Sequence, residues 1–578
     1  IYEQTCAAEK RRRRKKGEML DPARRVFINE QVCEGCGDCS VQSNCVAVLP
    51  HETPLGRKRR IDQSACNKDY SCVKGFCPSF VGVLGGTPRR KSGALSDAGA
   101  ARDEFERRVA ALPLPAPHEW TGPYDLLVTG VGGTGVVTVG ALIAMAAHLE
   151  GKSASVLDFT GFAQKGGSVL SFVRWADRPE RLNQVRIDTQ QADALLACDL
   201  VVGASPEALQ SVRHGRTRIL ANLHEVPVAE SLRNPDASLR VDALLEKLHF
   251  AAGRERVQTF DAQTLAEDFL GDTIVANIVA LGCAWQLGLV PVGLPALQRA
   301  IELNGVAVRN NRLAFALGRL AAADPAACEA LRAGAADEAA GGAGDSIDAL
   351  IARGVEHLTG YQDSAYAQRY AERVQRVRMR EQALGADAAL PLTRAVAESL
   401  RKLMAYKDEY EVARLYTDGR FARQIKEQFE GELTLEFYMA PPLLARSVHG
   451  KPPRKLRFGA WLLPLLRVLA RGKALRGGAL DLFGRSAERR MERALITQYE
   501  ARVDELLERL QPGNLALAAE IARVPLAMRG FGHVKIANVA LARAREAELL
   551  HRLDPQRYPR PAPSAQAGQL KGIAIVAR

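Results

Sequence analysis

The sequence of 578 residues has no apolar run that is both long and unbroken, which argues against a membrane span. The longest such run, residues 126–147, is interrupted by five glycines and is typical of a strand, a turn and a helix. No secretory signal peptide is recognisable, which disfavours a small secreted disulfide-bonded protein. The content of 47% hydrophobic and 25% charged residues excludes disorder along the whole chain. We therefore expect a cytoplasmic protein with no membrane partner.

Acidic residues are in the minority, because 66 Asp and Glu stand against 79 Lys and Arg, and the net charge of +13 favours acidic partners. Seven consecutive basic residues occupy positions 10–16, and residues 57–60 form a second basic segment. The first run could bind nucleic acid, form a solvated linker, or attract an acidic electron carrier. Because no aromatic stacking residues or reading helix lie nearby, we expect no nucleic-acid partner.

Seven of the eleven cysteines fall within residues 33–77, with the spacing C-x2-C-x2-C-x5-C followed by C-x5-C-x4-C-P. A C-x2-C-x2-C turn can wrap three corners of a cubane cluster. In two-cluster ferredoxins, the cysteine before a proline closes the cluster of the other half. The pattern therefore predicts one [4Fe–4S] cluster held by Cys33, Cys36, Cys39 and Cys77.

The other three cysteines of this block, Cys45, Cys66 and Cys72, would hold a second cluster, but the pattern supplies no fourth cysteine. Asp69 is a candidate fourth ligand, and the site could equally have none. Zinc is the alternative for these thiols, although the triple at two-residue spacing is unlike the paired knuckles of structural zinc sites. The isolated cysteines are expected to be buried or free thiols: Cys6, Cys198, Cys283 and Cys328.

A glycine-rich turn, Gly130-x-Gly132-Gly133-x-Gly135, follows a short apolar strand at residues 125–130 and precedes a helical run at residues 136–149. It matches the dinucleotide fingerprint, and Asp158, at the end of the strand 155–158, could bind a ribose hydroxyl. An NAD(P) or flavin site is thus an alternative to glycines that only permit a tight turn. Residues 200–203 read as a later strand, and strands alternating with helices favour a doubly wound parallel sheet.

The loop after Asp158 contains Gln164-Lys165-Gly166-Gly167, which favours a surface that meets another module. An ordinary nucleotide-binding domain does not need such a loop. Several polar residues lie between apolar runs, and we expect them to make structural hydrogen bonds, cap helices or lie in solvent rather than act in chemistry. These residues are Arg174, Asp193, Asp199, Asn277, Glu302 and Asn304, together with Lys68 and Lys74, which flank the cysteines and could instead tune the potential of a cluster.

The cysteine block from Val32 to Pro78, together with the glycine-rich turn and the loop 164–167, resembles the fused bacterial indolepyruvate ferredoxin oxidoreductases of the 2-oxoacid:ferredoxin oxidoreductase superfamily. The segment 528–535, Met-Arg-Gly-Phe-Gly-His-Val-Lys, is similar to the C-terminal region of that family. The resemblance spans about residues 1–550 and implies a multidomain fold of α/β and α parts.

The resemblance implies a ferredoxin-like [4Fe–4S] domain, then a doubly wound parallel α/β domain of the gamma type, then a mainly helical C-terminal domain. The expected order is a basic linker 1–20, the cluster domain 21–90, a linker 91–122, the gamma-type domain 123–325, a linker 326–346, the helical domain 347–555 and a tail 556–578.

The resemblance further implies oxidative decarboxylation of indolepyruvate or another aryl pyruvate to an aryl-acetyl-CoA, with CoA as co-substrate and electrons passed through the clusters to an acidic ferredoxin. Thiamine diphosphate and Mg²⁺ are the implied cofactors of the decarboxylation. No Gly-Asp-Gly segment followed by an Asn pair is found. We therefore expect thiamine-binding modules to precede this chain in a longer polypeptide, and the fragment alone to transfer electrons without decarboxylating.

We assign no catalytic residue and expect a homo-oligomer. Two rival functions remain open. One is a flavin- and NAD(P)-linked iron–sulfur oxidoreductase, which calls for a second dinucleotide fingerprint that the sequence does not contain. The other is a non-enzymatic electron-transfer protein.

Overall fold

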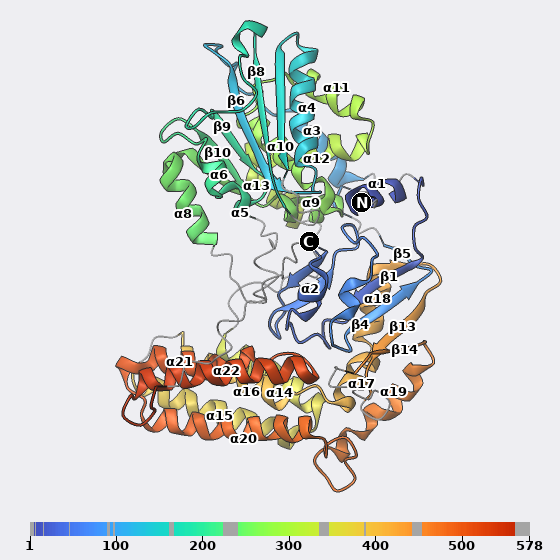
Figure 1. The fold of residues 1–578 in the computed structure, drawn as a ribbon, viewed down its shortest axis with the longest axis vertical. Helices are drawn as coiled ribbons and strands as arrows, with labels where there is room; N and C mark the ends of the chain where they lie inside the picture. Colours follow the sequence, from blue (N-terminus) through green and yellow to red (C-terminus); the bar gives the residue numbers. More distant parts are fainter. Residues whose placement is uncertain are drawn as a thin grey trace, which may run out of the picture.

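Three regions make up the fold, and Figure 1 shows them as a large sheet with helices, a smaller region of short strands and a layered set of long helices. We call them the sheet region (residues 93–333), the cysteine region (17–89) and the helical region (346–560). The computed structural model describes residues 5, 7–15, 17–45, 47–89, 93–95, 99–160, 167–223, 241–333, 346–385, 389–441 and 453–560.

The sheet region is built on six strands in the order β11-β10-β9-β6-β8-β7. The pairs β11–β10, β10–β9 and β9–β6 are parallel, as expected for a doubly wound sheet, whereas β8 is antiparallel to both β6 and β7. The strand bounds are β6 Tyr124–Val131, β7 Ser153–Thr160, β8 Ser168–Ala176, β9 Ala194–Ala197, β10 Arg218–Asn222 and β11 Val257–Phe260.

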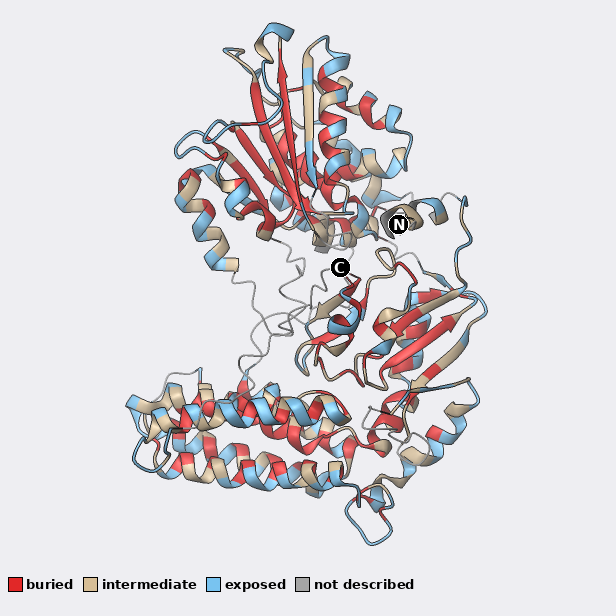
Figure 2. Ribbon diagram, viewed as in Figure 1, coloured by how far each residue is buried: buried red, intermediate tan, exposed pale blue. Residues whose placement is uncertain are grey.

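Helices cover both faces of this sheet, and its inner strands β6, β8, β9 and β10 are largely buried, whereas the edge strands β7 and β11 are partly exposed (Figure 2). The expectation of a strand at residues 200–203 is wrong. That segment is helix α5, Leu200–Gly203, and the Asp199 side chain caps it by accepting from the Val202 N–H at 2.9 Å. The other helices are α4 Val136–Leu149, α6 Pro206–Leu209, α8 Val241–Ala252, α9 Ala262–Leu270, α10 Ala276–Gln286, α11 Leu294–Asn304 and α12 Val308–Ala323.

Two segments expected to be linkers contribute to the core of the sheet region. Helix α3, Ala100–Ala110, lies within residues 91–122, and its Phe105 is buried. Helix α13, Pro325–Ala333, carries Ala327 and Cys328 into the same hydrophobic cluster. Apolar side chains at helical spacing give both segments a face to bury, which their Ala-rich and Pro-rich composition obscures.

The cysteine region shares a sheet with the helical region. The sheet has the strand order β1-β4-β13-β14, in which neighbouring strands are antiparallel. Strands β1 and β4 come from the cysteine region, whereas β13 and β14 come from the helical region. The bounds are β1 Arg24–Ile28, α2 Asp38–Ser43, β2 Val48–His51, β3 Lys58–Ile61, β4 Phe80–Leu84, β5 Thr87–Pro88, β12 Phe429–Glu430, β13 Thr434–Met439 and β14 Leu456–Phe458.

Long helices form most of the helical region, and their facing sides are buried in one hydrophobic cluster (Figure 2). Its smaller helices α17 and α18 pack on the shared sheet, where Phe421 and Phe437 lie in one cluster with Val81 and Val83. The bounds are α14 Ile347–Tyr361, α15 Ser364–Gln382, α16 Pro391–Met404, α17 Glu409–Thr417, α18 Arg420–Gln428, α19 Leu462–Arg471, α20 Ala487–Glu508, α21 Leu515–Arg523 and α22 Gly532–Leu553.

Residues 10–15 of the basic run belong to helix α1, Ala7–Lys15, which Figure 1 shows between the sheet region and the cysteine region. Among the described helices, none combines the length and the apolar character that crossing a bilayer requires.

Candidate functional site

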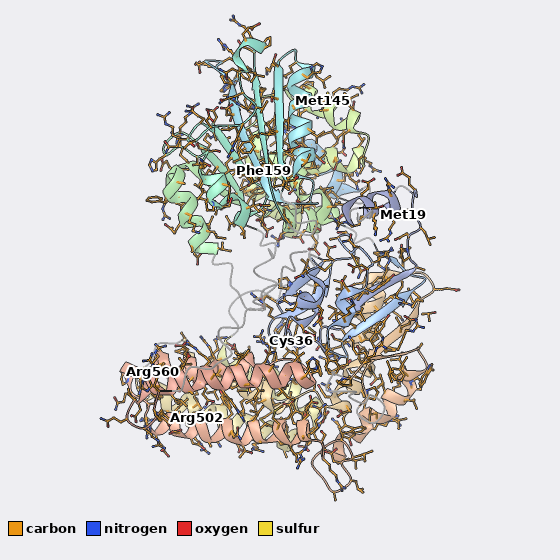
Figure 3. All side chains as sticks on the ribbon, viewed as in Figure 1. Met19, Cys36, Met145, Phe159, Arg502 and Arg560 are labelled. Carbon is orange, nitrogen blue, oxygen red and sulfur yellow. The ribbon has the colours of Figure 1, made fainter. Side chains whose placement is uncertain are left out.

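Four cysteines of the cysteine region line one small cavity: Cys33, Cys36, Cys39 and Cys77. Cys33 and Cys36 lie in the loop after β1, Cys39 lies in helix α2, and Cys77 directly precedes Pro78. Figure 3 shows Cys36 on the side of the cysteine region nearest the helical region. Two glycines allow the close approach of these segments. A Cβ at Gly35 would lie 2.1 Å from the Arg57 carbonyl oxygen, and a Cβ at Gly75 would lie 2.9 Å from the Cys39 Cα.

Burial and mutual repulsion disfavour thiolates in this group. Burial, followed by the charges of Cys77 and Cys33, raises the pKa of Cys39 well above the usual value for a thiol. The pKa of Cys36 is raised by burial and then by Cys77. Deprotonation of these crowded thiols is therefore unfavourable in the absence of a bound cation. A bound metal removes the penalty, because coordination deprotonates thiols and supplies the compensating positive charge.

The other three cysteines of the block form a second group. Burial and then the charges of Cys66 and Cys45 raise the pKa of Cys72 to about 12. The Lys68 main-chain N–H donates to the Cys66 Sγ at 3.4 Å. Asp69 lies near this group, but its Oδ1 accepts from the main-chain N–H of Ser71 at 3.1 Å and from its hydroxyl at 2.9 Å. The carboxylate therefore acts as a turn cap in this structure.

The spacing of the thiols bears on which metal centre they fit. Within the part of the chain that the structure describes, no three His, Cys, Asp or Glu side chains converge closely enough to hold one metal ion. A structural zinc ion needs four ligands at about 2.0–2.3 Å from one point. The first group instead surrounds a cavity, which four thiols line together with Glu34 and Asp38. This donor set fits an iron–sulfur centre better than a single zinc ion.

The glycine-rich turn is held by specific hydrogen bonds. The Gly132 N–H donates to the Gly167 carbonyl at 2.7 Å, and the Asn277 side chain donates to the Thr134 carbonyl at 2.9 Å. A Cβ at Gly130 would lie 2.6 Å from Val136 Cγ2, so this glycine permits close packing of strand and helix. The expectation that Asn277 is structural agrees with this contact. Residues 164–166 lie outside the described residues.

Asp158 is not positioned to complete a dinucleotide site. It is exposed on the edge strand β7, and β8 lies between this strand and β6. In dinucleotide-binding folds, the acidic residue lies at the end of the second strand, and this strand pairs directly with the first strand. Two strand spacings, or about 10 Å, separate β7 from β6 in this sheet. The order of the strands therefore argues against the nucleotide alternative.

Helix α1 joins the second cysteine group to the glycine-rich turn. Arg11 donates to the Ala65 carbonyl and Arg14 donates to the Asn67 carbonyl, both at 2.6 Å, on either side of Cys66. The other guanidinium nitrogen of Arg11 lies 3.1 Å from where a Cβ at Gly133 would stand. Arg11 and Arg14 of the basic run thus make specific contacts from a helix.

The second basic segment is only partly at the surface. Lys58 and Arg59 are buried, and Arg59 lines the cavity of the first cysteine group. Arg57 pairs with Glu52, and Arg60 is exposed. Simple alternation along β3 does not account for this, because the neighbouring residues Lys58 and Arg59 are both buried. The segment therefore cannot offer four cations to an acidic partner.

Of the other polar residues singled out from the sequence, some lie as expected and others do not. Arg174 forms a buried bidentate ion pair with Asp125, with N–O distances of 2.6 and 3.1 Å. Lys68 was expected to lie in solvent, but it pairs with Asp21 at 2.6 Å and its side chain is 6% exposed. Cys198, Cys283 and Cys328 are buried thiols, as expected.

Sequence reasoning missed the residues of the helical region that reach the first cysteine group. Lys455 donates to the carbonyls of Gly75 and Cys77, and the Tyr416 hydroxyl donates to the Pro78 carbonyl. No local signal marks these residues, because they lie more than 330 positions along the chain from their partners. The segment 528–535 was singled out, and its His533 ring lies 4.8 Å from the Phe76 ring.

Comparisons with known proteins match two parts of the chain. Residues 125–321 match the family described as pyruvate ferredoxin/flavodoxin oxidoreductase, and residues 347–548 match a family of unknown function. The indolepyruvate oxidoreductase subunit IorB of Pyrococcus horikoshii is 28% identical over 206 residues, 34% of this chain and 96% of that protein. The common gamma subunit of the pyruvate/ketoisovalerate oxidoreductases of Pyrococcus furiosus is 30% identical over 173 residues, 30% of this chain and 82% of that subunit.

A solved structure also matches. The gamma subunit of a keto/oxoacid ferredoxin oxidoreductase from Geobacter sulfurreducens is 28% identical, with a TM-score of 0.25, and the match covers 35% of this chain and 97% of that one.

Proposed function

Because the chain belongs to the pyruvate ferredoxin/flavodoxin oxidoreductase family, with IorB and gamma subunits among its relatives, we propose that it carries electrons from the oxidation of a 2-oxo acid to ferredoxin. The substrate class we propose is indolepyruvate or another aryl pyruvate, oxidised with CoA. We assign no residue of this chain to the thiamine-dependent decarboxylation, which we attribute to partner modules that hold thiamine diphosphate and Mg²⁺.

The single observation that carries the electron-transfer role is the cavity shared by Cys33, Cys36, Cys39 and Cys77. A [4Fe–4S] cluster at these thiols would supply one-electron transfer. The surrounding residues would exclude water, since Phe80 and Ile28 line the same cavity and are nearly fully buried. Cys45, Cys66 and Cys72 are proposed to hold a second cluster, with a fourth ligand that we leave unassigned.

The proposed domain roles follow from the contacts. The sheet region presents the glycine-rich turn, and helix α1 connects that turn to the second cysteine group. This arrangement supports a route in which electrons enter beside the glycine-rich turn and leave through the cysteine region. The acceptor we propose is an acidic ferredoxin, and the partner of the glycine-rich turn is the thiamine-binding module. Assembly as a homo-oligomer completes the proposal.

Anaerobic reconstitution of the full chain tests the proposal. We expect the wild-type chain to bind iron and acid-labile sulfide and to give a paramagnetic resonance signal on reduction. Cys33→Ser should lose one cluster, whereas the matched control Cys328→Ser, at a buried thiol of α13, should keep the wild-type iron content. A wild-type chain without iron and sulfide, or a Cys33→Ser variant with an unchanged spectrum, would overturn the assignment.

A further inference from the structure

The helical region holds the loop that carries Cys77 through its main chain. Lys455, directly before β14, donates from Nζ to the Gly75 carbonyl and, at 3.4 Å, to the Cys77 carbonyl. The Tyr416 hydroxyl donates to the Pro78 carbonyl at 2.6 Å. The region that matches a family of unknown function thus supplies donors along the segment 75–78.

A second contact comes from the start of α22. The His533 ring lies 4.8 Å from the ring of Phe76, and a Cβ at Gly532 would lie 2.7 Å from that ring. The segment 528–535 therefore lies against the same loop as Lys455. Together these contacts place the helical region over one side of the first cysteine group.

Lys455 differs from Lys68 and Lys407, two other lysines that contact the cysteine region, in how its charge is balanced. Its hydrogen bonds go to main-chain carbonyls, and its Nζ lies 4.8 Å from the centre of the Phe80 ring. Lys68, by contrast, pairs with Asp21 at 2.6 Å, and Lys407 lies 3.6 Å from Glu34. Carbonyls and an aromatic face hold an ammonium without cancelling its full charge.

A positive charge at this position acts on the redox equilibrium of the site. A cubane with four thiolate ligands is anionic, and one added electron makes it more negative. A nearby cation therefore stabilises the reduced form more than the oxidised form, and the reduction potential rises. The effect is larger in a buried site than in water, because the effective dielectric constant is lower.

We propose that Lys455 of the helical region raises the reduction potential of the cluster held by Cys33, Cys36, Cys39 and Cys77, an inference that rests on the proposed function. Lys455 is a positioning residue that acts through its charge on the first cluster. This gives the helical region a function: it supplies the electrostatic environment of one redox centre.

Redox titration of the reconstituted full chain, followed by paramagnetic resonance, tests the proposal. Lys455→Gln removes the charge and keeps an N–H donor, Lys455→Met removes both, and Lys455→Arg keeps the charge. Lys473→Gln is the matched control, because Lys473 also donates to a carbonyl, that of Gly360 at 2.9 Å, within the helical region. We expect both neutral variants to lower the ratio of reduced to oxidised first cluster about tenfold at a fixed potential, equal to about 59 mV.

Each other result decides against the inference. Neutral variants with full iron content and the wild-type potential would overturn it, as would a shift in Lys455→Met alone, which would assign the effect to the hydrogen bonds. An equal shift of the reduction potential in the control Lys473→Gln would show that the effect is not specific to Lys455. Loss of iron from both neutral variants, while Lys455→Arg retains it, would show that Lys455 stabilises the site rather than tunes its potential. A wild-type chain without iron would instead overturn the proposed function, and the inference with it.

Discussion

The Tyr416 hydroxyl donates a 2.6 Å hydrogen bond to the carbonyl oxygen of Pro78, the residue after the fourth cysteine of the first group. The tyrosine ring is buried and packs edge-on against Phe421 and Phe437, with centroids 5.0 and 5.2 Å apart. A core side chain of the helical region thereby fixes the main chain next to Cys77. Retention of the proposed cluster should therefore depend on a residue far from its ligands in sequence.

The first prediction concerns this hydrogen bond. Tyr416→Phe keeps the ring and leaves the Pro78 carbonyl without its donor, which should cost about 1 kcal/mol in urea unfolding. Release of iron to a chelator should also become faster. Tyr499→Phe is the control, because its hydroxyl donates to Ala522 at 2.9 Å inside the helical region. Equal rates of iron release in the two variants would contradict the proposed link.

The second prediction concerns the buried pair of Arg174 and Asp125, whose side chains are 4% and 7% exposed. Arg174→Leu should destabilise the sheet region by about 3–5 kcal/mol, because it leaves an unpaired buried carboxylate. The double variant Arg174→Leu with Asp125→Leu should recover much of this loss. Denaturant unfolding of the single and double variants measures the coupling. Additive losses would show that the two charges do not depend on each other.

The third prediction concerns helix α1. Replacing Arg11 and Arg14 with alanine removes the donors to the carbonyls of Ala65 and Asn67. The second cluster should then lose iron faster, while the first keeps its wild-type rate. Arg13→Ala is the control within the same helix, since Arg13 is half exposed and pairs with Glu9. If Arg11→Ala and Arg14→Ala release iron from the second cluster at the same rate as Arg13→Ala, the helix does not support the second group.

The fourth prediction concerns nucleotides. Since β8 separates Asp158 from the glycine-rich turn, calorimetric titration with NADH or NADPH should show no binding in the low micromolar range, which would be worth about −8 kcal/mol. ADP serves as the comparison for non-specific binding. Tight binding that Asp158→Ala abolishes would restore the dinucleotide interpretation.

Cys33, Cys36, Cys39 and Cys77 line one cavity in the structure, and their binding of a cluster stays a prediction from their spacing. The C-x2-C-x2-C segment is a local turn, so three of these cysteines can be brought together without distant contacts. Strand and helix assignment was less reliable for short apolar runs. Residues 200–203 carry four small or apolar side chains, which suit a strand as well as a helix, and the cap at Asp199 decides the outcome. The helix of α1 was hidden by its run of arginines.

The strands of the helical region could not be predicted from local pattern. Strand β13 pairs with β4, and the partners are hundreds of residues apart, so only the tertiary fold selects the pairing. The same reason hid Lys455 and Tyr416 from sequence reasoning. Long-range pairing overrides a pattern that is otherwise helical over most of residues 347–553.

The pairing of β13 with β4 also sets an order of events in biosynthesis. Leu84 meets Thr434, about 350 residues later, so the ribosome needs about 20–70 s after β4 emerges to deliver its second neighbour. During that interval one edge of β4 stays unpaired, and such edges invite association with other chains. The sheet region is translated in between and can fold first. Completion of the cysteine region, and with it loading of the proposed cluster, is therefore a late step that follows synthesis of residue 439.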